Sequence, residues 1–216
     1  MVLAGLARRG GRRVTPLSLA ACAGAVDVVA FAGLGGAFAS IVTGNLVVAG
    51  LGIGTADDHV FATPAVAVAG YSAGVLWAQA TPGWRWPAHL VVELALLGAL
   101  TAGWVATDGR PGPTTSLLLL ATAGVAMGTQ SVVAHRMHES TTYLTGTLTG
   151  ALHDLVAGLR GRRAAAFGQL AALTAGGAVA AVLFQTVRWS VPLLAICLLL
   201  LAMAARGCAM GRGALS

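Results

Sequence analysis

The sequence predicts an all-α integral membrane protein, and three observations support this fold class. Of its 216 residues, 57% are hydrophobic and only 9% are charged, whereas a soluble domain carries about 25% charged residues. The charges cluster between apolar runs of about 15 to 24 residues, which is the length of a helix that spans a bilayer. Several patterns also recur about a hundred positions apart. We therefore expect two pseudo-symmetric halves, each with three full transmembrane helices and one short or re-entrant helix.

Eight helical segments follow from the apolar runs and from the breaker sequences TADDHVFATP, TPGWRWP and TDGRPGP between them. The basic N-terminus imitates a signal peptide, but Asp27 would interrupt its apolar core, so we expect an uncleaved first helix. Trp84, Trp86, Trp104 and Trp189 lie at segment ends, where tryptophan favours the membrane interface. The expected helices are 17–38, 41–55, 64–80, 88–106, 115–134, 142–159, 164–187 and 189–205.

An internal duplication is indicated by four matches in the same order. Thr43-Gly44 recurs as Thr145-Gly146, and SAG at 72–74 recurs as TAG at 174–176, both at an offset of 102. Arg85-Trp86 recurs as Arg188-Trp189 at an offset of 103. AGAVD at 23–27 resembles AMGTQ at 126–130, which pairs Asp27 with Gln130. The expected divisions are a basic segment at 1–15, repeats at 16–107 and 114–206, and a tail at 207–216.

The number of crossings follows from segment length and charge. Segment 41–55 is about 23 Å long as a helix, which is short for a hydrocarbon core of roughly 30 Å. Segment 142–159 carries His153 and Asp154, which are costly in lipid. Six crossings with cytoplasmic termini leave only Arg110 and Arg188 of the 13 arginines outside; eight crossings is the alternative. Three crossings per half would invert one half relative to the other, a pattern common in secondary transporters.

The pattern VD…F…LGG.F…TGNLV at 26–47, followed by TTYLTGTLT at 141–149, resembles the YoaK-like family of bacterial inner-membrane proteins, domain of unknown function 1275. The resemblance covers essentially the whole chain, and TTYLTGTLT is its most specific part. It implies a multi-pass protein of the bacterial inner membrane and adds little about the substrate.

Two Thr-Gly steps interrupt apolar segments and predict a central binding site. Threonine is a good N-cap, glycine tolerates a bend, and the first N–H groups of a helix remain free and positive. Two such starts would face each other across a substrate site, as in discontinuous-helix transporters. The predicted binding residues are Asp27, Thr43, Gly44, Asn45, Gln130, Thr145, Gly146 and Thr147. The alternative is helix packing through G-x-x-x-G pairs, which are Gly50/Gly54, Gly70/Gly74, Gly124/Gly128 and Gly146/Gly150.

Two carboxylates lie inside apolar segments and are the expected proton-coupling residues. Asp27 lies about ten residues into the first segment, and an ionisable group there suggests a function. Glu93, in HLVVELALL, is the second such residue. The alternative for Asp27 is a structural role as a protonated or helix-capping carboxyl group.

Catalytic residues, metal ligands and cofactors are not expected. HRMHE at 135–139 lacks a helical pair of metal ligands, and GYSAG at 70–74 lies in a hydrophobic helix instead of a strand-turn-helix elbow. His153-Asp154 is either a proton relay or a solvated helix end. Cys22, Cys197 and Cys208 show neither a disulfide nor a zinc pattern. The arginines flank apolar segments, so we expect the lipid bilayer and not nucleic acid as the partner.

Two functions fit these features. The first is a small-molecule secondary transporter or exporter, in which Asp27→Asn abolishes pH-coupled flux. The second is a non-transporting scaffold or a lipid- or partner-interacting protein; a dry, closely packed centre with Asp27 bonded to a backbone group would favour it. The sequence names neither the substrate nor the oligomeric state.

Overall fold

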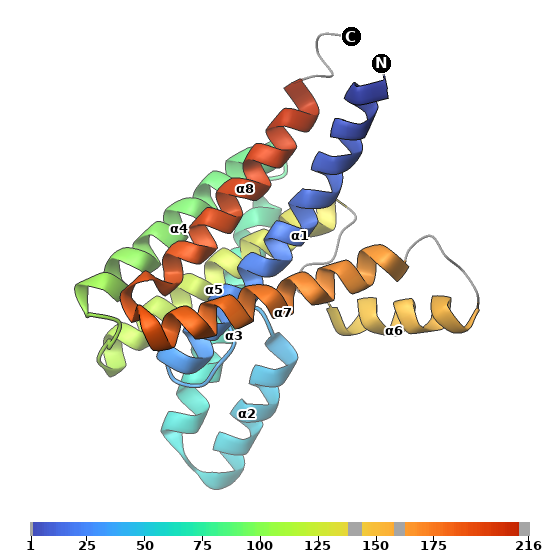
Figure 1. Cartoon of the computed structure of the whole chain (residues 1–216). Coiled ribbons are helices and arrows are strands. Elements are labelled where there is room, and N and C mark those ends of the chain that lie inside the picture. The colour runs from blue at the N-terminus through green and yellow to red at the C-terminus, as the bar shows by residue number, and fades with distance from the viewer. Residues whose placement is uncertain (1, 138–143, 158–162, 212–216) are drawn as a thin grey trace.

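The computed structural model describes residues 2–137, 144–157 and 163–211, and all regular elements in these ranges are helices (Figure 1). Long helices form the bundle, while α2 and α6 project from it as shorter hairpin partners of α3 and α7. The elements are α1 (Val2–Gly33), α2 (Val42–Thr55), α3 (Asp58–Ala80), α4 (Trp86–Ala106), α5 (Pro113–Arg136), α6 (Leu144–Val156), α7 (Arg163–Thr186), the 3-10 helix η1 (Arg188–Ser190) and α8 (Val191–Gly211).

Six helices in the described ranges are long and apolar enough to cross a membrane, so the expected all-α multi-pass fold is confirmed. They belong to α1, α3 and α4 before the connection at 107–112 and to α5, α7 and α8 after it. By contrast, α2 has 14 residues and α6 has 13, so neither reaches the length of about 20 residues that a bilayer requires.

Four helix boundaries differ from the predicted ones by five residues or more. Helix α1 begins at Val2 instead of residue 17, and α8 ends at Gly211 instead of residue 205. The other two boundaries differ for local reasons. The first helix was predicted to reach residue 38 but ends at Gly33, because Gly35 and Gly36 adopt φ of 117° and 85° and turn the chain out of the helix. The third helix begins at Asp58 instead of residue 64. Its N-cap Asp57 accepts hydrogen bonds from the backbone N–H groups of His59 and Val60.

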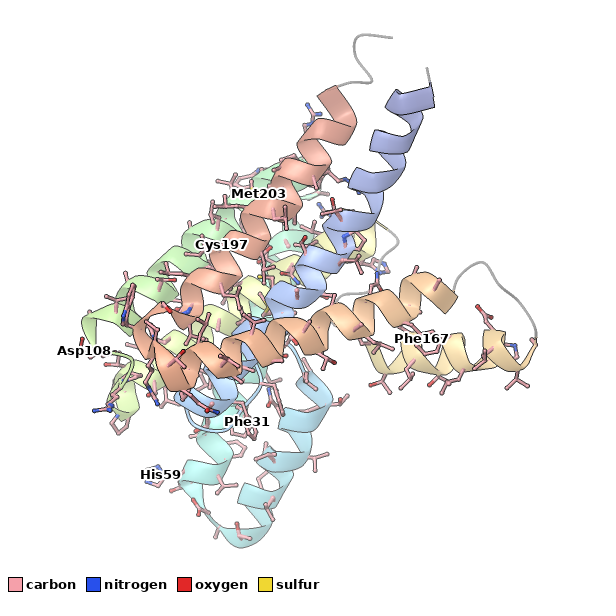
Figure 2. The ribbon with its side chains drawn as sticks, viewed as in Figure 1. Phe31, His59, Asp108, Phe167, Cys197 and Met203 are labelled. Carbon is pink, nitrogen blue, oxygen red and sulfur yellow. The ribbon has the colours of Figure 1, made fainter. Side chains whose placement is uncertain are left out.

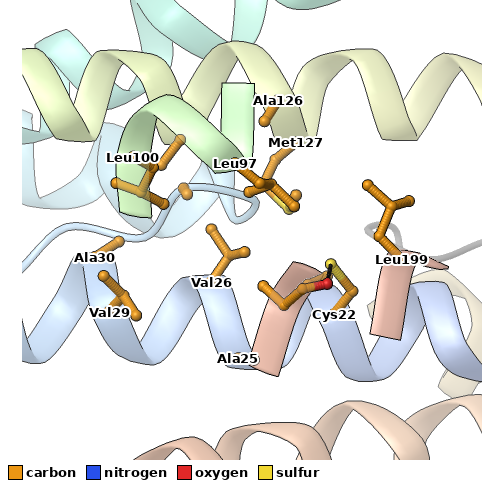
Figure 3. Close-up of a cluster of buried hydrophobic side chains, with 14 of the residues drawn as sticks. Cys22, Ala25, Val26, Val29, Ala30, Leu97, Leu100, Ala126, Met127 and Leu199 are labelled. Atoms are coloured by element: carbon orange, nitrogen blue, oxygen red, sulfur yellow. Dashed lines mark hydrogen bonds between the residues drawn. The ribbon is translucent and has the colours of Figure 1, made fainter. Parts of the chain in front are cut away.

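The core lies around α1 and α5. Their membrane spans are 78% and 72% buried, whereas the other four are 17% to 39% buried. In Figure 3, Cys22 and Val26 of α1 face Leu97 of α4 and Met127 of α5, and Leu199 of α8 closes the cluster. The Cys22 thiol also lies 3.4 Å from the carbonyl of Ala195 on α8. By helix packing, α1 is therefore enclosed mainly by helices of the last four, and α5 mainly by helices of the first four.

The helix contacts are reciprocal between the first four and the last four helices. Helix α1 packs against α7 and α8, and α5 packs against α3 and α4. Helix α2 packs against α3 and α6 packs against α7, while α1 meets α5 and α4 meets α8. Exchanging the two sets of four leaves these pairs unchanged, whereas the smaller contact between α7 and α8 has no counterpart of its size between α3 and α4. In Figure 1, α1 and α5 run in opposite directions, as do α4 and α8.

Glycine contacts show which residues of the first four helices correspond to which residues of the last four. A Cβ on Gly24 would collide with the carbonyl of Leu173, and a Cβ on Gly128 would collide with the carbonyl of Tyr71. Gly128 follows Gly24 by 104 positions, whereas Leu173 follows Tyr71 by 102. The pairing of Asp27 with Gln130 is therefore wrong by one residue, and Asp27 corresponds to Ser131. The sequence comparison missed this because Ala and Gly are too frequent in these helices to fix a register.

The G-x-x-x-G pairs divide into two kinds. Gly70/Gly74 of α3 and Gly124/Gly128 of α5 pack backbone against backbone at one crossing, so the packing interpretation is confirmed there. Within the described residues, a Cβ on any glycine of the pairs Gly50/Gly54 and Gly146/Gly150 would meet nothing within 4 Å. The packing interpretation is therefore wrong for contacts of these two pairs inside the described part of the chain.

Arginine–tryptophan pairs close both ends of the α4–α8 contact. The Arg206 guanidinium of α8 lies 5.3 Å from the ring of Trp86, at the start of α4. The Arg188 guanidinium lies 5.7 Å from the ring of Trp104, near the end of α4. Trp86 thus corresponds to Arg188 and Trp104 to Arg206, both at an offset of 102, so the predicted match of Arg85-Trp86 with Arg188-Trp189 is wrong by one residue. Trp104 was expected at the membrane interface, but it is fully buried and donates its indole N–H to the carbonyl of Arg188 at 2.9 Å.

Candidate functional site

A non-helical segment at residues 34–41, here called the 34–41 linker, connects α1 to α2 and is buried at Leu34, Ala37, Ala39 and Ser40. Leu34, Ala37 and Ala39 are each 1% exposed. Irregular backbone at membrane depth is tolerated only where protein covers it or where it lines a cavity. Here, protein covers these side chains, so the linker is part of the packed structure.

Asp27 holds this linker against α1. Its carboxylate accepts one hydrogen bond from the backbone N–H of Ser40 at 2.9 Å and another from the Ser40 hydroxyl at 2.6 Å. Both residues are buried. Hydrogen bonds to a charged group stabilise more than neutral ones, so this pair fixes the linker position. Sequence reasoning missed Ser40 because a single serine in an Ala- and Gly-rich stretch gives no distinctive signal.

Asn45 holds the same linker from the other side. Its amide nitrogen donates to the Phe38 carbonyl at 2.6 Å, and its amide oxygen accepts from the Phe38 N–H at 2.9 Å. Helix α2 begins at Val42 with Ile41 as an N-cap that makes no side-chain bond, so the prediction of Thr43 as the N-cap is wrong. Thr43 is exposed and Gly44 is half-buried. Of these three residues, Asn45 is the one whose side chain binds the backbone of the linker.

The second Thr-Gly step lies in the first turn of α6. Thr145 and Gly146 are exposed, and Thr147 is half-buried. The Thr145 carbonyl accepts a hydrogen bond from the Thr149 hydroxyl at 3.1 Å, within the same helix. Residues 141–143 of the TTYLTGTLT stretch lie outside the described residues.

The two short helices lie on different hairpins. Helix α2 packs along α3, and α6 packs along α7. Extensive packing between α2 and α6 is absent in the described part of the chain. In the view of Figure 1, the N-terminal end of each helix is nearer to the middle of the bundle than its C-terminal end. His59 and Phe167 mark the two hairpins in Figure 2.

A second group of buried polar side chains lies on α4 and α5. Glu93 is completely buried, and neither carboxyl oxygen has a hydrogen-bond partner among the described residues. Gln130 donates its amide to the Leu19 carbonyl of α1 at 3.0 Å, but its amide oxygen is unpartnered. Because Gln130 bonds to Leu19 and Asp27 bonds to Ser40, these two predicted site residues have separate partners.

One further unpartnered atom extends this group along α4. His89, one turn before Glu93, is buried; its Nε2 lies 3.0 Å from the Thr81 hydroxyl, and its Nδ1 lacks a partner. Buried polar atoms nearly always have partners. His89, Glu93 and Gln130 therefore stand out as groups that packing alone does not explain.

The remaining motifs form no reactive group in the described ranges. Three or more His, Cys, Asp and Glu residues that could hold a metal do not come together there; His135 is exposed, while His138 and Glu139 lie outside the described residues. Ser72 of GYSAG is exposed on α3, between two glycines that pack against α5, as expected for a packing motif. His153 is exposed and Asp154 is half-buried at the end of α6.

Comparison with known proteins agrees with the membrane fold. The chain is 30% identical over 140 residues to the UPF0700 transmembrane protein YoaK of Bacillus subtilis (strain 168), and the alignment covers 62% of each chain. The chain thus aligns with less than two thirds of that relative's length. No solved structure gives a significant match. The model of a family described as protein of unknown function (DUF1275) matches residues 16–205, and the chain belongs to this family.

Proposed function

We propose that this protein is a small-molecule secondary transporter or exporter built from two inverted halves. The observation that carries this proposal is the reciprocal packing of α1–α4 with α5–α8. Each half contributes three candidate spans, and an odd number of crossings reverses the orientation of the second half. Inverted repeats with interrupted helices are a recurring architecture of secondary transporters.

The proposed membrane is the bacterial inner membrane, with both termini in the cytoplasm. The start of α1 and the end of α8 lie at the same end of the bundle (Figure 1), as six crossings require. The arginine distribution supports a cytoplasmic location for this end. The connections at 56–57 and 107–112 would then lie outside, and the α6–α7 connection inside.

The proposed solute path lies between the starts of α2 and α6. Thr43 and Thr145 are exposed, so their hydroxyls are accessible, and the first N–H groups of a helix have no partner within the helix itself. Gly44, Gly146 and Thr147 supply the neighbouring backbone. Asn45 has a different role in this proposal, because both ends of its amide bind Phe38.

We assign proton coupling to Glu93 in preference to Asp27. Ser40 donates two hydrogen bonds to Asp27, whereas both oxygens of Glu93 lack partners and a second unpartnered acceptor, on Gln130, belongs to the adjacent helix. A carboxyl group that can exchange its proton must be free of fixed donors in at least one state. Asp27 then holds the linker that carries α2.

The orientation of the halves is tested by two single cysteines in a Cys-free background. Asp58→Cys at the start of α3 and Ala157→Cys after α6 both lie at exposed positions. A membrane-impermeant thiol reagent labels them from opposite faces if the halves are inverted. Labelling of both from the same face means eight crossings with parallel halves, and the architectural support for transport is lost.

Transport is tested in proteoliposomes that contain a pH-sensitive dye. Mixtures of amino acids, sugars and inorganic cations are added outside, and proton movement is recorded. We expect one mixture to drive proton movement in the wild type and not in Glu93→Gln. If Glu93→Gln moves protons as fast as the wild type, the assignment of Glu93 is wrong.

The second candidate is a non-transporting membrane scaffold or lipid- or partner-interacting protein. One observation favours it: the Asp27 carboxylate is bonded to the backbone N–H of Ser40, in a centre where glycines pack tightly against neighbouring carbonyls. In this case, a cysteine at Gly44 or Gly146 reacts from one face only, under every solute and pH condition. Reaction that shifts between faces with solute or pH excludes this candidate.

A further inference from the structure

A cavity opens at the end of the bundle where α3 and α5 end, α4 begins and α8 approaches its last turns. Its volume is about 400 Å³, within the range of small-molecule sites. Two arginines, Arg136 and Arg206, and two tryptophans, Trp84 and Trp86, line it together with Gln79 and two apolar residues. Among the residues that the structure describes, none of those lining the cavity is acidic.

Arg136 is held in place by a neutral contact. Its guanidinium donates to the carbonyl of Ala78, in the last turn of α3, at 2.8 Å. A guanidinium has five N–H donors, so this bond orients the group and leaves donors for a ligand. A backbone carbonyl does not neutralise the charge.

Arg206 is also positioned without being neutralised. Its guanidinium lies over the Trp86 ring at 5.3 Å, which orients the planar group while leaving its edge donors free. The Trp84 ring is 47% exposed and packs edge-on against Trp77 at 5.6 Å. Two half-buried arginines and an exposed indole therefore border one cavity.

At the opposite end of the α4–α8 contact, protein groups surround the corresponding arginine, Arg188. There, Arg188 donates to the Gly109 carbonyl at 2.7 Å and lies 3.9 Å from the Phe184 ring centre. Protein groups occupy the space around that guanidinium. At the Arg206 end, the corresponding position borders the cavity.

We infer that this cavity, here called the Arg136–Arg206 site, binds the anionic phosphate group of a phosphate ester. Planar guanidinium groups match phosphate geometry and bind it through two parallel hydrogen bonds. The tryptophans are the residues that favour the headgroup region of a bilayer. Basic pockets between transmembrane helices bind anionic lipid headgroups, and a soluble phosphate ester presents the same chemistry. This site is independent of the transport proposal.

The test is a titration of the purified protein in neutral detergent with palmitoyl-oleoyl phosphatidylglycerol, followed by native mass spectrometry. We expect Arg136→Gln and Arg206→Gln each to weaken binding about tenfold, because each removes charge-assisted hydrogen bonds. Arg85→Gln is the matched control: Arg85 is exposed between Trp84 and Trp86, carries the same charge and does not line the cavity.

A competition arm separates the two sources of phosphate. Millimolar glycerol 3-phosphate is added to the lipid-loaded protein. If the lipid stays bound, the site selects a lipid headgroup; if it is displaced, the site binds soluble phosphate esters. The inference is overturned if the Arg136→Gln and Arg206→Gln proteins bind the lipid like the wild type, or if Arg85→Gln weakens binding equally.

Folding of each variant is checked by size-exclusion chromatography. If a Gln variant aggregates, Arg206→Lys with Arg85→Lys as its control replaces it. Lysine keeps the charge but lacks the planar fork, so we expect weaker binding only at position 206. Equal binding by both Lys variants and the wild type would also contradict the site.

Discussion

The two ends of the α4–α8 contact share one plan and differ in what fills them. At one end, Trp104 is completely buried, and Arg188 bonds to Gly109 and lies over Phe184. At the other end, Arg206 lies over Trp86 beside the Arg136–Arg206 site. Two ends built on one symmetric helix arrangement therefore differ in their surroundings. Protein groups fill the Arg188 end and stabilise the bundle, whereas a cavity borders Arg206 at the other end.

The largest effect that this comparison predicts is on stability at the filled end. Trp104→Ala should lower the free energy of unfolding by about 4 kcal/mol, because it removes a fully buried ring and its bond to the Arg188 carbonyl. Denaturant titration in mixed micelles measures this. Trp189→Ala is the control, since Trp189 is 52% exposed. Equal losses for both variants would mean that the burial of Trp104 does not stabilise this end.

Arg188→Gln should have the next largest effect. The loss of the bond to the Gly109 carbonyl and of the contact with Phe184 costs about 2 kcal/mol. The same titration compares it with Arg110→Gln, an exposed arginine in the neighbouring connection. An unchanged midpoint for Arg188→Gln would show that this arginine does not stabilise the filled end.

Gly109→Ala should destabilise the same end by about 1.5 kcal/mol. Gly109 has a φ of 69°, a left-handed conformation that disfavours a Cβ, and an added Cβ would press on Arg188 and Trp104. Gly112→Ala lies in the same connection, in open space, and should melt like the wild type. The midpoint of denaturant unfolding measures both variants. An equal shift of this midpoint in Gly112→Ala and Gly109→Ala would show that the left-handed conformation and the contacts of Gly109 are not the cause.

Arg206→Gln should have the smallest effect on stability, about 0.5 kcal/mol, because it removes only a half-exposed contact with a ring. Its expected consequence is for phosphate binding instead. Thermal unfolding of the lipid-free protein measures the stability effect. A loss as large as that of Arg188→Gln would remove the distinction between the two ends.

Much of the fold could be predicted from composition and periodicity. Apolar runs of spanning length identified six spans, and the shortness of 41–55 separated α2 from them. The register of the repeat could not be predicted, because the glycines that fix it touch backbone carbonyls of distant helices. The burial of Trp104 was missed for the same reason: its partner Arg188 lies 84 residues away.

The candidate site was less accessible to sequence reasoning. Asp27, Asn45 and Glu93 were singled out because polar side chains are conspicuous in apolar segments, and all three are buried. Their roles depend on partners that a sequence does not reveal. Ser40 and Phe38 occupy the first two residues, whereas both oxygens of Glu93 lack partners.

The contacts of α1 have a consequence for how the protein is made. This helix leaves the ribosome before the other helices of the bundle, yet it packs mainly against α7 and α8, which are synthesised after α2 to α6. Asp27 can meet Ser40 early, since only 13 residues separate them, but the glycine contact with Leu173 must wait for most of the chain. Membrane insertion and tertiary assembly are thus separated in time. A nascent chain arrested before α7 would hold α1 in lipid without its main partners, so this stage is when insertion factors or quality-control proteases can act on it.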